Sequence, residues 1–114
     1  MLNNVTSITD TSFNTHLFKS QSWTLLYFWA RWSGPCRLLS LFMEHSAKVY
    51  GDRLQVLKID TDLSPALAKY YQVHHVPTLH LLYRGELVDS VEGVLSRPQL
   101  EQMLSAHLLK VPVP

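Results

Sequence analysis

The stretch Thr24–Cys36, which reads T-L-L-Y-F-W-A-R-W-S-G-P-C, joins a run of large apolar side chains to a segment that begins a helix. The run Thr24–Ala30 is apolar without alternation, which is typical of a strand covered on both faces and predicts a central place in a sheet. Pro35 follows and fits the first turn of a helix, where backbone N–H groups lack an intrahelical partner. Ser33 is placed to cap that helix, so the stretch predicts a strand followed directly by a helix.

Further regular elements flank this stretch on both sides. Before it, Asp10 is placed to cap a helix over Thr11–Lys19. After it, the helix continues until Gly51-Asp52, and Leu54–Ile59 has the pattern of another buried strand. Ser64-Pro65 combines a capping residue with a proline at the first helical position, so a short helix is expected to follow.

The last third of the chain predicts a hairpin and a final helix. Arg84-Gly85 is expected to form the turn between the extended runs Val76–Tyr83 and Glu86–Val91. Ser96-Arg97-Pro98-Gln99 is a capping box, whose serine and glutamine satisfy free N–H groups at the start of the final helix. Residues 110–114 cannot extend that helix because prolines interrupt them, and we expect a loose tail.

The composition fits one folded domain. The chain has 114 residues, of which 46% are hydrophobic and 17% charged, so there is enough apolar material for a core. Strands that alternate with helices, followed by a hairpin, predict an α/β fold with a mixed sheet covered on both faces. We therefore expect a single domain over residues 1–114.

The charge pattern argues against nucleic acid and membranes as partners. The formal net charge is +1 and no basic stripe is present to neutralise phosphates or anionic lipids. The longest apolar stretch, Leu25–Trp32, is broken at Arg31, and a membrane-spanning helix needs about 20 residues. The first residues lack the positive charge and apolar run of an export signal, so we expect a cytoplasmic protein.

Cys36 is the only cysteine, which limits the chemistry available to one chain. A single cysteine excludes an internal disulfide and a zinc site built from several thiolates, so any redox chemistry involves a second molecule. His74 and His75 offer too few ligands for closed zinc coordination and are expected to be solvated loop residues. We expect neither a metal nor a cofactor.

The segment Phe28–Cys36, F-W-A-R-W-S-G-P-C, resembles the active-site region of the thioredoxin family, whose pattern is F-W-A-x-W-C-G-P-C. Val76-Pro77-Thr78 is similar to the family's cis-proline loop, and Gly93 matches the glycine after its hairpin. Lys58-Ile59-Asp60 falls where the family has an I-D pair at a strand end. The resemblance covers nearly the whole chain and implies a thioredoxin fold, with about five strands flanked by about four helices.

The resemblance also implies a protein-disulfide reductase, and the chain departs from it at that chemistry. In the family, one cysteine attacks a substrate disulfide and a second, resolving cysteine releases the reduced product. Ser33 stands in the position of the attacking cysteine, and Cys36 matches the resolving one. A serine hydroxyl stays protonated where a thiol can ionise, and it cannot form a disulfide.

Two buried polar residues of the family are also expected to be missing. Tyr27 takes the position of an aspartate that moves a proton to and from the resolving cysteine, and Val56 is assigned to that of a nearby lysine. A buried carboxylate is costly and is kept where its shifted pKa is useful. Its replacement predicts that this proton relay is not used.

The remaining surface can still bind a partner. The resemblance implies that an extended peptide lies beside the cis-proline and pairs with the backbone just before it, a mode known as β-augmentation. The residues expected to form this surface are Trp32, Gly34, Pro35, Val76, Pro77 and Gly93.

Three functions stay open at this point. The first is a protein-binding or assembly module without dithiol activity. The second is monothiol exchange in which Cys36 forms a mixed disulfide with glutathione or a partner's cysteine. The third is an ordinary thioredoxin whose attacking cysteine has been exchanged for Ser33 by engineering. Only the second and third of these functions would make the chain an enzyme.

Overall fold

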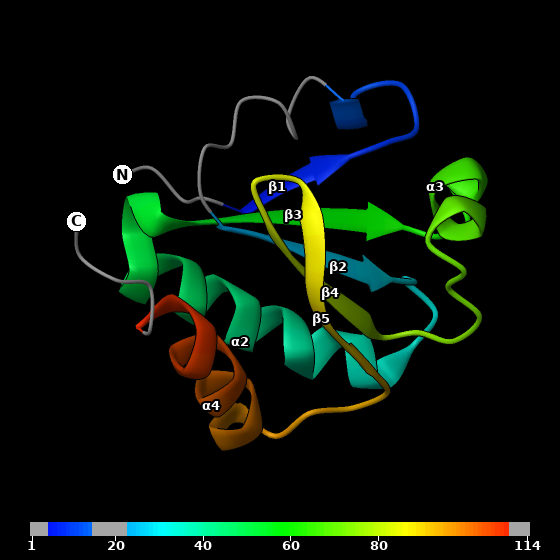
Figure 1. The fold of residues 1–114 in the computed structure, drawn as a ribbon. Coiled ribbons are helices and arrows are strands. Elements are labelled where there is room, and N and C mark those ends of the chain that lie inside the picture. Colours follow the sequence, from blue (N-terminus) through cyan, green and yellow to red (C-terminus); the bar gives the residue numbers. More distant parts are fainter. Residues whose placement is uncertain (1–4, 15–22, 110–114) are drawn as a thin grey trace.

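The computed structural model describes residues 5–14 and 23–109, and a five-stranded sheet forms its centre (Figure 1). The strands are β1 (Val5–Ile8), β2 (Trp23–Trp29), β3 (Leu54–Asp60), β4 (Thr78–Tyr83) and β5 (Glu86–Glu92). The helices are α2 (Gly34–Tyr50), α3 (Pro65–Tyr70) and α4 (Arg97–Leu108), with the short 3-10 helix η1 (Gly51–Arg53) after α2. Within the described ranges no helix is long and apolar enough to cross a membrane.

The sheet is mixed, which confirms the predicted fold class. The strands lie in the order β1-β3-β2-β4-β5. β3 runs parallel to β1 and β2, whereas β4 is antiparallel to β2 and β5 is antiparallel to β4. The parallel pair β2 and β3 needs a crossover connection, which α2 provides, while Arg84-Gly85 closes the β4–β5 hairpin.

β2 lies in the middle of the sheet, and its side chains alternate between two apolar cores. On one face, Leu25 and Tyr27 pack with residues of α2 and α4. On the other face, Leu26 and Phe28 pack with the core that includes Leu67 of α3. All four β2 side chains have 0% of their surface exposed, so this strand is covered on both faces as predicted.

The helices agree with the sequence prediction in part. Three α-helices lie in the described residues, against about four expected. The helix expected over Thr11–Lys19 falls largely on residues 15–22, which are outside the described part, as is the tail 110–114. The predicted capping box of α4 is present, because the Gln99 amide donates to Ser96 Oγ at 3.2 Å and the Ser96 amide donates to Gln99 Oε1 at 2.9 Å.

The cap of α3 is a correction to the sequence prediction. Ser64 occupies the N-cap position, but its side chain makes no capping hydrogen bond. The Asp10 carboxylate takes this role, accepting the Ala66 amide at 3.2 Å and the Leu67 amide at 2.9 Å. A charged acceptor with two oxygens satisfies two free N–H groups at once, and it ties the loop after β1 to α3.

Candidate functional site

The segment Ser33–Cys36 links β2 to α2. Ser33 is the N-cap residue of α2, with extended backbone angles (φ −90°, ψ 113°) and no side-chain capping bond. The Ser33 amide donates to the Ala30 carbonyl at 3.1 Å, and the Cys36 amide donates to the Ser33 carbonyl at 3.2 Å. These two bonds place position 33 at the end of the turn that follows β2 and position 36 in the first turn of the helix.

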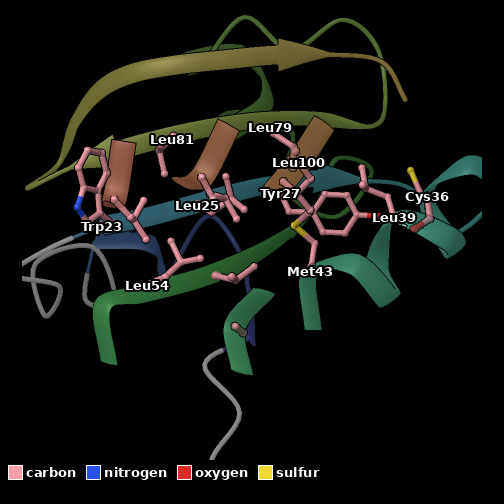
Figure 2. Packing of buried hydrophobic residues seen from close by; sticks show 14 residues of the cluster. Trp23, Leu25, Tyr27, Cys36, Leu39, Met43, Leu54, Leu79, Leu81 and Leu100 are labelled. Atoms are coloured by element: carbon pink, nitrogen blue, oxygen red, sulfur yellow. Dashed lines mark hydrogen bonds between the residues drawn. The ribbon is translucent and has the colours of Figure 1, made fainter. Parts of the chain in front are cut away.

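Both side chains that bear on thiol chemistry are buried. Ser33 has 6% of its surface exposed and Cys36 has 0%. Cys36 belongs to the same apolar core as Leu39 and Met43 of α2 (Figure 2). A cysteine reacts as an accessible thiolate, and this thiol is enclosed by apolar side chains, so a substrate disulfide cannot reach it in this conformation.

Tyr27 fastens the first turn of α2 to the sheet. Its hydroxyl donates to the Cys36 carbonyl at 2.6 Å and lies 3.0 Å from Ser40 Oγ, which itself donates to the same carbonyl at 2.9 Å. Figure 2 shows the Tyr27 ring between β2 and the start of α2. Burial raises the pKa of Tyr27 well above its usual value, so the phenol keeps its proton and does not serve as a base near neutral pH.

A lysine lies beside Tyr27, at a position other than the one that the resemblance matched to the family's lysine. The strand register pairs Tyr27 with Lys58 and Leu25 with Val56. The Lys58 ammonium lies 4.4 Å from the centre of the Trp29 ring and 5.9 Å from that of Tyr27. Side chains two residues apart lie on the same face of a strand, so Val56 and Lys58 share a face of β3. The strand register shows that Lys58, and not Val56, lies opposite Tyr27. A lysine is therefore present near Tyr27, while Val56 occupies the position matched to the family's lysine.

The cis-proline loop lies in the short connection between α3 and β4. The Val76–Pro77 peptide bond is cis. The Gly93 amide donates to the Pro77 carbonyl at 2.9 Å, and Thr78 Oγ1 donates to the His75 carbonyl at 2.6 Å. Gly93 has a φ of 99°, a backbone angle that glycine adopts readily. The carbonyls on either side of Val76 are therefore fixed, while Val76 itself forms no backbone hydrogen bond among the described residues.

Trp32 precedes α2 in the sequence and lies beside the cis-proline loop in the structure. Its side chain is 69% exposed, and its indole Nε1–H donates to Asp62 Oδ2 at 2.9 Å. Together with Val76 it lines a hollow of about 250 Å³. The other residues that line this hollow are Thr61, Val73, His74 and His75.

The structure therefore brings most of the expected site residues together and adds others. Pro77 and Gly93 join through a hydrogen bond, and Gly34 and Pro35 are exposed at the start of α2. Sequence reasoning missed Thr61, Val73 and Asp62, because they follow β3 and α3 in a region without a recognisable motif.

The two histidines of the loop are exposed, and His75 has a carboxylate partner. His75 Nε2 lies 3.8 Å from Glu92 Oε1, and 70% of the His75 side chain is exposed. Across residues 5–14 and 23–109, no group of three or more His, Cys, Asp or Glu side chains is placed to hold a metal ion.

A family model described as Thioredoxin matches residues 4–106. The chain belongs to the thioredoxin family. Among similar proteins, a thioredoxin-like protein of Synechocystis sp. is 41% identical over 89% of this chain and 93% of its own length. The thioredoxin of Griffithsia pacifica is 35% identical over 91% of this chain and 95% of its own length.

A solved structure supports the same fold. A mutant thioredoxin from Halobacterium salinarum superposes with a TM-score of 0.83 at 32% identity, covering 95% of this chain and 94% of that one. The chain is thus a thioredoxin-family protein with a single cysteine. The thioredoxin fold predicted from the sequence is confirmed.

Proposed function

We propose that this thioredoxin-family protein does not reduce disulfides through a dithiol and instead binds a protein segment at its cis-proline surface. One observation carries the proposal: Ser33 stands at the attacking position, and the single sulfur of the site, Cys36, is 0% exposed. A lone cysteine also fits a reducing compartment, and we propose the cytoplasm.

The chemistry of disulfide reduction requires two sulfurs. The first forms a mixed disulfide with the substrate, and the second breaks that bond while both give up an electron to form an internal disulfide. Ser33 cannot form the first bond, and Cys36 has no second thiol in the chain with which to complete the cycle. The site therefore has no route for passing two electrons to a substrate on its own.

The backbone at the cis-proline supports binding. An extended peptide adds to a protein through main-chain hydrogen bonds, and pockets for its side chains provide selectivity. Val76 has a backbone N–H and C=O without partners among the described residues, and the hollow lined by Trp32 lies next to it. Its volume of about 250 Å³ is below the range typical of cofactor sites and suits a single side chain.

The structure bears on the two alternatives differently. Monothiol exchange through Cys36 requires access to its sulfur, and the burial of Cys36 argues against this alternative. An engineered exchange at Ser33 is opposed by Tyr27, which an engineer removing a thiol has no reason to install. The second argument of this kind rests on Val56, and it carries less weight because Lys58 lies beside Tyr27.

Insulin reduction in the presence of dithiothreitol tests the loss of activity. The wild-type chain is expected to give the background rate, and Ser33→Ala should behave identically. Ser33→Cys restores a pair of sulfurs and is the positive control for this scaffold. A wild-type rate well above that of Ser33→Ala would contradict the proposal.

Affinity capture from the native cytoplasm tests binding. Trp32→Ala removes a side chain that is 69% exposed, and Tyr70→Ala is the matched control because Tyr70 is 75% exposed and lies on α3. We expect specific partners to be retained by the wild type and by Tyr70→Ala, and lost with Trp32→Ala. Partners captured equally by all three proteins would show that the cis-proline surface does not bind them.

A further inference from the structure

The groove beside the cis-proline is the hollow lined by Trp32 and Val76, and two carboxylates contact residues that line it. Asp62, in the loop after β3, accepts the indole N–H of Trp32 at Oδ2 at 2.9 Å, and Trp32 lies in the turn before α2. Glu92, at the end of β5, directly precedes Gly93, and its Oε1 lies 3.8 Å from Nε2 of His75, which lines the hollow. The side chain of Glu92 is 57% exposed, so it is accessible to an incoming group.

Nearby basic groups do not neutralise these carboxylates. Arg31 Nε lies 3.4 Å from Asp60 Oδ2, so that pair is satisfied internally. The Lys58 ammonium is placed over the Trp29 ring. Arg37 is exposed on α2 and forms no ion pair with a described residue. His75 is the basic side chain that touches Glu92, and its imidazole is a weaker and more easily displaced partner than an ammonium or guanidinium group.

We propose that this groove prefers an extended peptide with a lysine or arginine next to the residue that pairs with Val76, and that Glu92 binds this basic side chain in place of His75. The proposal rests on the proposed function, since main-chain pairing at Val76 sets the register of the peptide. The uncharged walls of the hollow, Trp32 and Val73, then receive a neighbouring side chain of the same peptide.

The contribution of Glu92 is expected to be modest. Both Glu92 and His75 are largely exposed, and exposed charge pairs contribute little because water screens them. We therefore expect a preference for a basic over a neutral residue of roughly two- to fivefold in affinity. A preference of this size favours some peptides over others, but it does not determine whether a peptide binds.

Fluorescence anisotropy with labelled peptides tests the proposal. A nonapeptide without cysteine is first selected from a random library on the wild-type chain, and is then synthesised with lysine, glutamine or glutamate at the position beside the pairing residue. Glu92→Gln is expected to weaken the lysine peptide roughly two- to fivefold and to leave the glutamine peptide unchanged. Glu86→Gln is the matched control, because Glu86 is an exposed carboxylate at the other end of β5.

His75→Gln is a second variant with the opposite expectation. Removing the imidazole frees Glu92, so the lysine peptide should bind at least as tightly as to the wild type. Equal affinity of the lysine, glutamine and glutamate peptides would overturn the charge preference while leaving the proposed binding function intact. Failure to select any peptide whose binding depends on Trp32 would instead overturn the proposed function.

Discussion

Replacing Tyr27 with phenylalanine removes one hydroxyl group from the centre of the site and keeps the ring. In the structure this hydroxyl donates to the Cys36 carbonyl at 2.6 Å and lies 3.0 Å from Ser40 Oγ. The carbonyl keeps the Ser40 hydroxyl at 2.9 Å as a donor, so the substitution leaves no buried acceptor without a partner. Because the loss is limited to one hydrogen bond, we expect the free energy of unfolding to fall by about 1 kcal/mol.

Urea denaturation followed by tryptophan fluorescence measures this change. With a slope of about 2 kcal/mol per molar urea, a loss of about 1 kcal/mol moves the midpoint by roughly 0.5 M. Tyr70→Phe is the matched control, since Tyr70 is 75% exposed and its variant should stay within about 0.5 kcal/mol of the wild type. An unchanged midpoint for Tyr27→Phe would refute the claim that this hydroxyl fastens α2 to the sheet.

Three further predictions address other parts of the chain. Asp10→Ala removes both bonds to the start of α3 and should cost about 1 kcal/mol of unfolding free energy in the same assay; an unaltered midpoint would show that another group caps this helix. Burial lowers the pKa of His80, so the unfolded chain takes up a proton first as pH falls below about 6.5, and stability should decline there. His80→Leu should flatten this decline in urea titrations between neutral and acidic pH, and an equal decline in both proteins would assign it to other groups. Ser33→Cys combined with Tyr27→Asp should reduce insulin faster than Ser33→Cys alone, because a carboxylate can accept the proton of Cys36; equal rates would show that Tyr27 does not limit the chemistry.

Elements with strong local signals were predicted well from the sequence. β2 was expected one residue further along the chain than it lies, because an uninterrupted apolar run marks a buried strand clearly but not its ends. The capping box of α4 depends only on neighbouring residues, and it is present as predicted. β1 was missed because Val5–Ile8 has just four residues, two of them polar.

Features that depend on contacts between distant segments were not predictable from the pattern. The cap of α3 comes from Asp10, more than fifty residues earlier in the chain, so the local Ser64 gave the wrong expectation. The resemblance matched Val56 to the family's lysine, whereas the position of Lys58 opposite Tyr27 follows only from the strand pairing. Glu92 is near the site because its side chain contacts His75, and no sequence motif predicts this contact.

The reactivity of Cys36 in the folded chain decides whether the site holds a sulfur that can reach a disulfide. The purified protein is incubated with oxidised glutathione, and mass spectrometry measures the fraction of Cys36 that carries glutathione, with the chain unfolded in urea as the positive control. We expect Cys36 to stay unmodified in the folded protein and to react once the chain is unfolded, because the thiol is 0% exposed. Comparable modification of the folded and unfolded chains would contradict it, since a sulfur at the site would then be open to a disulfide.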